Sequence, residues 1–438
     1  MTAPLLARSR RRAELSLGLL VVAVTGGGYI LVALSEGPAL PPDLYAFLAG
    51  IFALYLVAHL AVRRFAPNAD ATILPIVALL NGIGFVIIAR LGPVKAEYAE
   101  QARVQALWVA IAIAVFVLTL VIVRDVRVFE RYRYTALLAG VVLILLPIAP
   151  GIGRTVNGAR LWIAIGPMSF QPSEIAKVLL AAFIAAYLVD KRELLTYGRT
   201  RIAGMFVPSP RDLGPLLLAW GIALVVLGYQ RDMGTAILFF GMFVAMLYMA
   251  TSRAAYLVGG LVLLAIGAWI AYKSFGHVRV RVENWIDPWK DPNDAGFQPI
   301  QGWFSLGSGG VAGTGLGLGN PGLVPKASTD YVFTAIGEEL GLVGSLGVVA
   351  AFMLLVGSMF RAAVDAVHPF SKVFAAGLAT IVGLQAFLIV GGVLRIIPLT
   401  GITLPFVSYG GSSLVANFAL VAIVLRISDE AATARAAP

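Results

Sequence analysis

Two aspartates, Asp287 and Asp291, each stand immediately before a proline in a stretch rich in aromatic residues. Proline lacks a backbone donor and biases the residue before it toward an extended conformation. Trp289 and Phe297 could exclude water from Asp291 and raise its pKa, the usual tuning of a general base. Asp-Pro is also a common turn opener. The residues alone therefore leave open which aspartate, if either, does chemistry.

A second group of ionisable residues follows Gln171-Pro172-Ser173. Glu174 and Lys177 are three residues apart, so they share one helix face and can form an ion pair. Ionisable residues within a membrane are expensive and usually mark a functional cavity. The alternative interpretation is a structural ion pair at the membrane interface. Arg160, in the polar stretch just before this group, is a further candidate cation.

Other polar stretches interrupt apolar ones. One is Gln230-Arg231-Asp232, and another runs from Pro398 to Ser413, with two prolines, paired glycines and hydroxyls. The second stretch is typical either of a broken helix whose freed backbone groups line a cavity, or of a kinked span packed through small residues. Physics alone does not decide between the two.

The elements that hold these residues must lie in a membrane. Hydrophobic residues make up 59% of the 438 residues and charged residues 13%, against roughly 25% charged in soluble domains. The chain contains no cysteine, which excludes disulfides and thiolate sites, and its three histidines lie far apart. The net charge of +10 comes from clusters at the ends of apolar runs, so nucleic acid is not an expected partner.

We expect about twelve membrane spans, since each needs roughly 20 apolar residues. They lie near 14–34, 43–62, 73–91, 105–123, 135–150, 174–189, 213–229, 232–250, 254–273, 332–357, 372–394 and 404–426. The predicted fold class is thus an all-α polytopic membrane protein. The connection 274–331 is far longer than an ordinary loop, and its aromatic residues favour an ordered, functional segment.

Positive charge sets the expected orientation. Basic residues fall in alternate loops, beginning with Arg8–Arg12 and Arg63-Arg64 and continuing to Arg426. These loops and both termini should be cytoplasmic. The loop 274–331 and the region 151–173 should therefore be extracytoplasmic.

Familiar catalytic motifs are missing. The sequence has no Walker A loop and no Ser-x-x-Lys with Lys-Thr-Gly, which excludes a P-loop ATPase and a penicillin-binding transpeptidase. The run Gly313-Thr-Gly315-Leu-Gly317-Leu-Gly319 resembles a nucleotide loop only superficially, because it is expected outside the cytoplasm and follows no βαβ unit.

Six motifs, in order, resemble those of the shape, elongation, division and sporulation (SEDS) family, which includes RodA, FtsW and SpoVE. They are Asn157-Gly158-Ala159-Arg160-Leu-Trp162; Gln171-Pro-Ser-Glu174-Ile-Ala-Lys177; Asp232-Met-Gly-Thr235; Asp291-Pro with Gly296-Phe-Gln298; Thr329-Asp330 through Gly337-Glu-Glu-Leu-Gly341; and Pro398-Leu-Thr-Gly401 through Ser408-Tyr-Gly-Gly-Ser-Ser413. The family usually has ten spans. The resemblance therefore divides the chain into an N-terminal tail with two extra helices (1–72), a ten-helix core (73–427) that contains the loop 274–331, and a cytoplasmic tail (428–438).

The resemblance implies a peptidoglycan glycosyltransferase that polymerises lipid II at the outer face of the bacterial cytoplasmic membrane, alongside a class B penicillin-binding protein. The family's essential loop aspartate maps onto Asp291. Residues in the matching motifs become candidates for binding lipid II and the undecaprenyl-linked glycan: Arg160, Gln171, Ser173, Glu174, Lys177, Asp232, Gln298, Asp330, Glu338, Ser408 and Ser412. Arg160 and Lys177 are candidates to balance the leaving diphosphate, with a divalent cation (Mg²⁺ or Mn²⁺) as a candidate cofactor. The extra helices and the glycine run favour an elongation role over a division role.

The sequence departs from the family pattern at Arg231, Ser328 and Asp294-Ala295, and none of these departures touches Asp291 directly. Two other functions compete with the enzyme. A lipid II flippase would suit the many spans, although transporters usually carry internal repeats, which are not evident here. A non-catalytic scaffold of the cell-wall machinery is the other.

Overall fold

The computed structural model describes residues 3–37, 44–98, 100–156, 159–165, 168–197, 200–202, 205–207 and 230–436, together with the isolated positions 214, 221, 225 and 228. It is predominantly helical. The chain divides into two compact units, and each is considered by itself. Unit 1 comprises residues 1–121, 271–358 and 385–425, and unit 2 comprises 122–270, 359–384 and 426–438.

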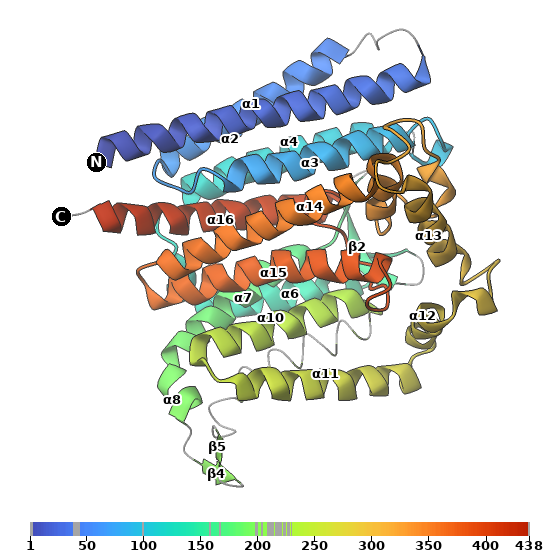
Figure 1. The fold of residues 1–438 in the computed structure, drawn as a ribbon. Helices are drawn as coiled ribbons and strands as arrows, with labels where there is room; N and C mark the ends of the chain where they lie inside the picture. The colour runs from blue at the N-terminus through green and yellow to red at the C-terminus, as the bar shows by residue number, and fades with distance from the viewer. Residues whose placement is uncertain are drawn as a thin grey trace. The chain divides into compact units, whose positions relative to one another are not determined.

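Unit 1 begins with four long apolar helices, α1 (Ala3–Glu36), α2 (Leu44–Phe65), α3 (Ile73–Leu91) and α4 (Gln101–Ile122). Helix α1 packs along α2 and α3 (Figure 1). The first two helices are held together by a buried carboxylate. Glu14 on α1 lies 2.7 Å from Nδ1 of His59 and forms an ion pair with Arg63, both on α2. A buried charge is tolerated in such a place because it is paired.

The long loop of unit 1 is folded. It holds α12 (Gly276–Ile286), the short turn η3 (Pro288–Lys290), α13 (Phe297–Gly309) and the turn η4 (Pro321–Leu323). Most of α14 (Val332–Asp365), the last part of α15 (Pro369–Val393) and most of α16 (Gly411–Ala436) complete the unit. The ordered character expected for this loop is confirmed.

Unit 2 is built around α7 (Ser173–Asp190), which packs against α6 (Arg133–Leu145) and α10 (Met233–Thr251) (Figure 1). Along α7 small and large apolar side chains are buried on nearly all sides, as expected for a helix enclosed by others. The other elements are α5 (Val128–Arg131), the turn η2 (Leu146–Ile148), α8 (Arg192–Tyr197), the hairpin β4 (Thr200–Ile202) and β5 (Met205–Val207), and α11 (Ala254–Ser274).

A small antiparallel sheet precedes α7. Its order is β1 (Gly153–Val156), β2 (Ala159–Ile165) and β3 (Met168–Phe170), and Ile163 pairs with both Gly153 and Phe170. Only irregular polar structure is expected here from the sequence, so these strands are a correction to that expectation. Pairing the strands satisfies backbone groups that no helix satisfies.

In the part of the chain that the structure describes, nine helices are long and apolar enough to cross a membrane. The expected span 213–229 lies almost wholly outside the described residues, and every other expected span coincides with a helix. The last span starts later than predicted. Helix α16 begins at Gly411, and residues 394–410 are not helical. The broken-helix interpretation of that stretch therefore describes the backbone better than the kinked span.

Candidate active site

The segment around Asp291 is a tight turn between η3 and α13. The amide of Gly296 donates to the carbonyl of Asp291 at 2.9 Å, and Nδ2 of Asn284 donates to the carbonyl of Ala295 at 2.8 Å. A Cβ atom on Gly296 would overlap the carbonyl of Pro288, so only glycine allows this turn to close. Hydrogen bonds to backbone carbonyls therefore hold the loop without using the carboxylate of Asp291.

The structure distinguishes the two aspartates that the sequence leaves equivalent. The carboxylate of Asp287 accepts the amide of Trp289 at 3.1 Å and caps η3. Asp291 is exposed, and among the described residues its carboxylate has no hydrogen bond or ion pair. Asp287 thus has a structural use, whereas Asp291 is available to a ligand.

The expected enclosure of Asp291 by aromatic rings is not found. Trp289 is 55% exposed and Phe297 is 39% exposed. The ring of Trp289 packs edge-on against Phe304, with centroids 6.0 Å apart. Asp291 is therefore exposed in this structure and is not enclosed by these rings.

Contacts within unit 1 bring three of the six motifs together. Nε2 of Gln298, in the first turn of α13, donates to the carbonyl of Pro325 at 2.8 Å. A few residues further on, the carbonyl of Ser328 accepts the amide of Tyr409, and the carbonyl of Thr329 accepts Oγ of Ser408 at 2.6 Å. The segment that leads into α14 thus accepts one freed amide and one hydroxyl of the broken stretch.

Asp330 follows in this segment and has cations nearby. Burial raises the pKa of its carboxyl, and a hydrogen bond with Thr329 and the charges of Arg281 and Lys326 act in the opposite direction. Nη1 of Arg281, on α12, also donates to the carbonyl of Thr400 at 2.7 Å. Arg281 therefore links α12 to the broken stretch.

Arg395 makes a second link of the same kind, and sequence reasoning missed both arginines. Its guanidinium donates to the carbonyls of Trp285 and Ile286 and lies 4.7 Å from the ring centroid of Trp303. Nε1 of Trp285 in turn donates to the carbonyl of Arg395 at 3.0 Å. The available signal was the presence of basic residues in loops that are expected to be extracytoplasmic, where few basic residues are expected.

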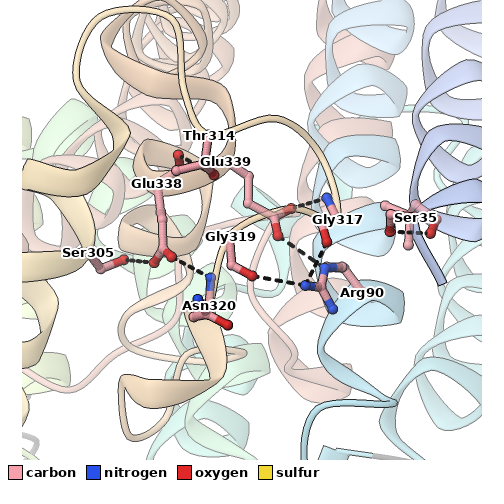
Figure 2. A network of polar contacts seen from close by, with 10 residues as sticks. Ser35, Arg90, Ser305, Thr314, Gly317, Gly319, Asn320, Glu338 and Glu339 are labelled. Atoms are coloured by element: carbon pink, nitrogen blue, oxygen red, sulfur yellow. Dashed lines mark hydrogen bonds and ion pairs between the residues drawn. The ribbon is translucent and has the colours of Figure 1, made fainter.

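Two other predicted site residues of unit 1 are buried. Glu338, on α14, has both carboxylate oxygens bound to groups of the same unit, Oγ of Ser305 and the amide of Asn320 (Figure 2). Ser412 is buried in the first turn of α16. Neither side chain faces solvent.

In unit 2 the predicted Glu174–Lys177 ion pair forms, with Nζ and Oε2 2.6 Å apart. Lys177 is 1% exposed and Glu174 is partly buried. The buried ammonium group of Lys177 is tolerated because the carboxylate of Glu174 is adjacent to it. The pair is compatible with both interpretations from the sequence, a functional cavity and a structural ion pair at the membrane interface.

The other predicted residues of unit 2 link the start of α7 to that of α10. Nε2 of Gln171 lies 3.0 Å from Oγ of Ser173 and 3.3 Å from Oδ2 of Asp232. Asp232 caps α10 by accepting the amide of Thr235 at 3.1 Å. Arg160 on β2 donates to the carbonyl of Ala149 at 3.1 Å. Asn157 and Gly158 lie outside the described residues.

No group of three or more histidine, aspartate or glutamate side chains that could hold a metal ion is present in the described part of the chain. A protein-held metal site therefore has no support there. The predicted site residues divide into two sets, Asp291 with Gln298, Asp330, Glu338, Ser408 and Ser412 in unit 1, and Arg160 with Gln171, Ser173, Glu174, Lys177 and Asp232 in unit 2.

The fold and these residues define a multi-pass membrane protein with an ordered loop that presents exposed carboxylates, Asp291 among them. Residues 71–433 match the family model described as Cell cycle protein, FtsW/RodA/SpoVE. The chain is 43% identical over 428 residues to the peptidoglycan glycosyltransferase RodA of Mycobacterium tuberculosis, an alignment that covers 97% of this chain and 91% of that one. It is 36% identical over 306 residues to the probable peptidoglycan glycosyltransferase FtsW of Geobacter metallireducens, covering 69% and 79% of the two chains.

A solved structure described as "Structural coordination of polymerization and crosslinking by a peptidoglycan synthase complex" matches with a TM-score of 0.68 and 26% identity, over 83% of this chain and 98% of that one. The chain belongs to the FtsW/RodA/SpoVE family. The family resemblance predicted from the motifs is confirmed.

Proposed function

We propose that this chain is a peptidoglycan glycosyltransferase that polymerises lipid II into glycan strands at the outer face of the bacterial cytoplasmic membrane. Its relatives carry that enzymatic name over nearly the whole chain. The alignment with RodA covers 97% of the chain and that with FtsW covers 69%. This difference supports a role in elongation rather than division.

The proposed orientation rests on charge. The basic clusters alternate along the chain, so both termini are assigned to the cytoplasm and the loop 274–331 to the outer side. Lipid-linked precursors present their sugars at that outer surface. The assignment therefore places the exposed carboxylate of Asp291 where a glycan acceptor can reach it.

The observation that carries the mechanism is the exposed carboxylate of Asp291, on a turn held by the amide of Gly296 and the side chain of Asn284. Asp291 accepts the proton of the 4-hydroxyl of the acceptor's N-acetylglucosamine. The hydroxyl oxygen forms a bond to the anomeric carbon of the donor's N-acetylmuramic acid, and the bond from that carbon to the diphosphate breaks. Undecaprenyl diphosphate leaves, and the configuration at the anomeric carbon inverts. General-base help of this kind contributes roughly 10²–10⁴-fold.

The leaving diphosphate needs positive charge, because stabilisation of developing charge is often the largest catalytic contribution. Arg160 and Lys177 are the cations assigned to it from the motifs. Lys177 already has a carboxylate partner, so it is less available than an unpaired lysine. Arg281 and Lys326, which act on Asp330, are additional cations in the unit that carries Asp291.

A divalent cation remains a proposal. Because the described side chains offer no metal-binding cluster, we propose that any Mg²⁺ or Mn²⁺ is brought by the diphosphate of the substrate. Titration with a chelator tests this. Polymerisation should fall with chelation, whereas the thermal stability of the substrate-free protein should not change.

We also propose a class B penicillin-binding protein as the partner. The matching solved structure is that of a complex that coordinates polymerization and crosslinking. This chain contains no Ser-x-x-Lys with Lys-Thr-Gly, so crosslinking would require a second protein. Each assay of activity should therefore include the partner.

The test uses purified protein, its penicillin-binding partner and lipid II in proteoliposomes. Glycan strands that are absent from reactions with Asp291→Ala support the proposal. Lipid II translocation without polymer would identify a flippase. Neither activity, in a complex that still assembles, would identify a scaffold.

A further inference from the structure

The glycine-rich segment that follows α13 (residues 310–320) is inserted into a break in α14. Gly341 interrupts that helix with φ 66° and ψ −166°. The amides that follow the break therefore lose their helical acceptors. Leu342 donates instead to the carbonyl of Gly310 at 3.0 Å, and Val343 donates to that of Val311 at 3.2 Å.

The carbonyls before the break are satisfied by the same segment. The carbonyl of Glu338 accepts the amide of Thr314 at 2.9 Å, and that of Glu339 accepts the amide of Gly315 at 3.0 Å. Four backbone hydrogen bonds thus join the segment to α14. The segment thus replaces the missing turn of the helix. Backbone groups freed by a break in a membrane span need other hydrogen-bond partners, and the segment supplies them.

This insertion explains the glycines. Gly313 has φ 85°, and a Cβ atom there would overlap the carbonyl of Glu339 and lie 2.7 Å from the amide nitrogen of Gly341. A Cβ atom on Gly309 would overlap the carbonyl of Gly337. The obstructing atoms are backbone atoms, so they cannot move aside as a flexible side chain could.

Side chains hold the rest of the segment (Figure 2). Glu339 accepts Nε of Arg90 at 3.1 Å through one oxygen and the amide of Gly317 at 3.1 Å through the other. Nη2 of Arg90, at the end of α3, donates to the carbonyls of Gly317 and Gly319 at 2.9 and 3.0 Å. The guanidinium and the carboxylate together clasp both sides of one backbone turn.

Glu338 connects the same segment to α13. Its Oε2 accepts Oγ of Ser305, on α13, at 2.6 Å, and its Oε1 accepts the amide of Asn320 at 2.5 Å. Glu338 is 5% exposed and Glu339 is 1% exposed. With every carboxylate oxygen already bound inside the unit, neither residue is available to a substrate.

We propose that Arg90, Glu338 and Glu339 are positioning residues, which fix the glycine-rich segment and α13 and thereby the turn that carries Asp291. Helix α13 starts at the residue after Gly296, whose amide is bonded to Asp291. Any displacement of α13 therefore moves the catalytic turn. The proposal rests on the proposed glycosyltransferase activity and replaces the prediction that Glu338 binds substrate.

Positioning makes a different kinetic prediction from substrate binding. Misplacement of a catalytic group by about 1 Å can reduce the rate by roughly a hundredfold without removing any substrate contact. Loss of a group that only binds the substrate, equally in the ground and transition states, instead raises KM and leaves kcat unchanged. Variants of Arg90 and Glu339 should therefore lower kcat while KM for lipid II changes little.

The experiment compares wild type, Arg90→Met and Glu339→Gln in the complex with the penicillin-binding partner, by lipid II kinetics and by hydrogen exchange of residues 284–298 and 307–320. Arg103→Met is the matched control, since its side chain is 85% exposed and its carboxylate partner is 3.7 Å away. We expect kcat to fall roughly tenfold to a hundredfold, with faster exchange in both segments. The control should match wild type.

A loss of activity with unchanged exchange, or a rise in KM alone, would overturn the proposal in favour of direct substrate contact. Wild type that makes no glycan, while Arg90→Met still loosens both segments, would refute the proposed function and leave the coupling of the segments standing.

A disulfide provides a second variant in case Arg90→Met fails to fold. The chain has no cysteine of its own. Val311 and Val343 are both exposed, and the amide of Val343 donates to the carbonyl of Val311, so the two residues are neighbours. In Val311→Cys/Val343→Cys carrying Glu339→Gln, oxidation should restore activity, and reduction should return kcat to the roughly tenfold to hundredfold deficit of Glu339→Gln. Failure of the pair to cross-link, or a cross-link that restores nothing, contradicts the positioning role.

Discussion

Replacement of Gly313 by alanine should separate the docked glycine-rich segment from α14. Alanine at φ 85° costs roughly 1–2 kcal/mol in backbone strain. Its Cβ would also overlap the carbonyl of Glu339, which cannot move aside. Undocking relieves both problems but forfeits the four backbone hydrogen bonds, at roughly 0.5–1.5 kcal/mol each.

Undocking costs at least about 2 kcal/mol, four bonds at roughly 0.5 kcal/mol each, and staying docked costs the strain plus the overlap. Either route therefore lowers the stability of the native protein by about 2 kcal/mol, more than a tenfold change in the folding equilibrium. We therefore expect Gly313→Ala to lower the midpoint of thermal unfolding and to reduce lipid II polymerisation at least about tenfold. The seven tryptophans allow unfolding to be followed by intrinsic fluorescence. Polymerisation is measured with the partner present.

Two neighbouring glycines are controls for this substitution. Gly310→Ala keeps open space around its Cβ, but its backbone (φ 51°, ψ −140°) lies in a region that L residues avoid, so it should lose roughly 1–3 kcal/mol through strain alone. Gly307→Ala lies inside α13 with nothing near its Cβ, so it should gain roughly 0.5–1 kcal/mol. If Gly313→Ala behaves like Gly307→Ala, the docking described for this segment is wrong.

Two further predictions concern the aspartate pair and unit 2. Asp287→Asn keeps the cap on η3 and should polymerise lipid II almost normally. Asp287→Ala loses the cap and should lose roughly 0.5–2 kcal/mol of loop stability. An inactive Asp287→Asn would indicate a chemical role for Asp287. Lys177→Met should destabilise the protein by roughly 3–5 kcal/mol because it leaves the Glu174 carboxylate without its partner. The double variant Glu174→Gln/Lys177→Met should recover much of that loss in thermal unfolding, and a double variant less stable than the single one would show that the pair is not the source of the effect.

Most spans could be predicted because a continuous apolar run of the right length has few other uses. The start of the last span could not, since hydropathy stays high from Leu404 onward while Pro405 and the paired glycines prevent the helix until Gly411. The short sheet before α7 was missed for a related reason. Its strands depend on mutual pairing, which no single window of sequence reveals.

The candidate site was predictable only in part. The distinction between Asp287 and Asp291 depends on a hydrogen bond within the η3 turn, and their identical Asp-Pro contexts conceal it. Arg90 was missed because it stands at the end of an otherwise apolar span. A lone ionisable residue in such a run nevertheless indicates a buried partner or a functional site. The docking of the glycine run was missed because it depends on Gly341, which lies beyond the run in the sequence.

The most direct test of the account is lipid II polymerisation by wild type and by Asp291→Asn, each in complex with the same class B penicillin-binding protein. Asparagine preserves the shape of the side chain and removes its basicity, and no hydrogen bond of the described loop uses the Asp291 carboxylate. The account predicts a stable, correctly assembled complex that forms glycan strands at least about a hundredfold more slowly than wild type. Glycan synthesis at the wild-type rate would contradict it.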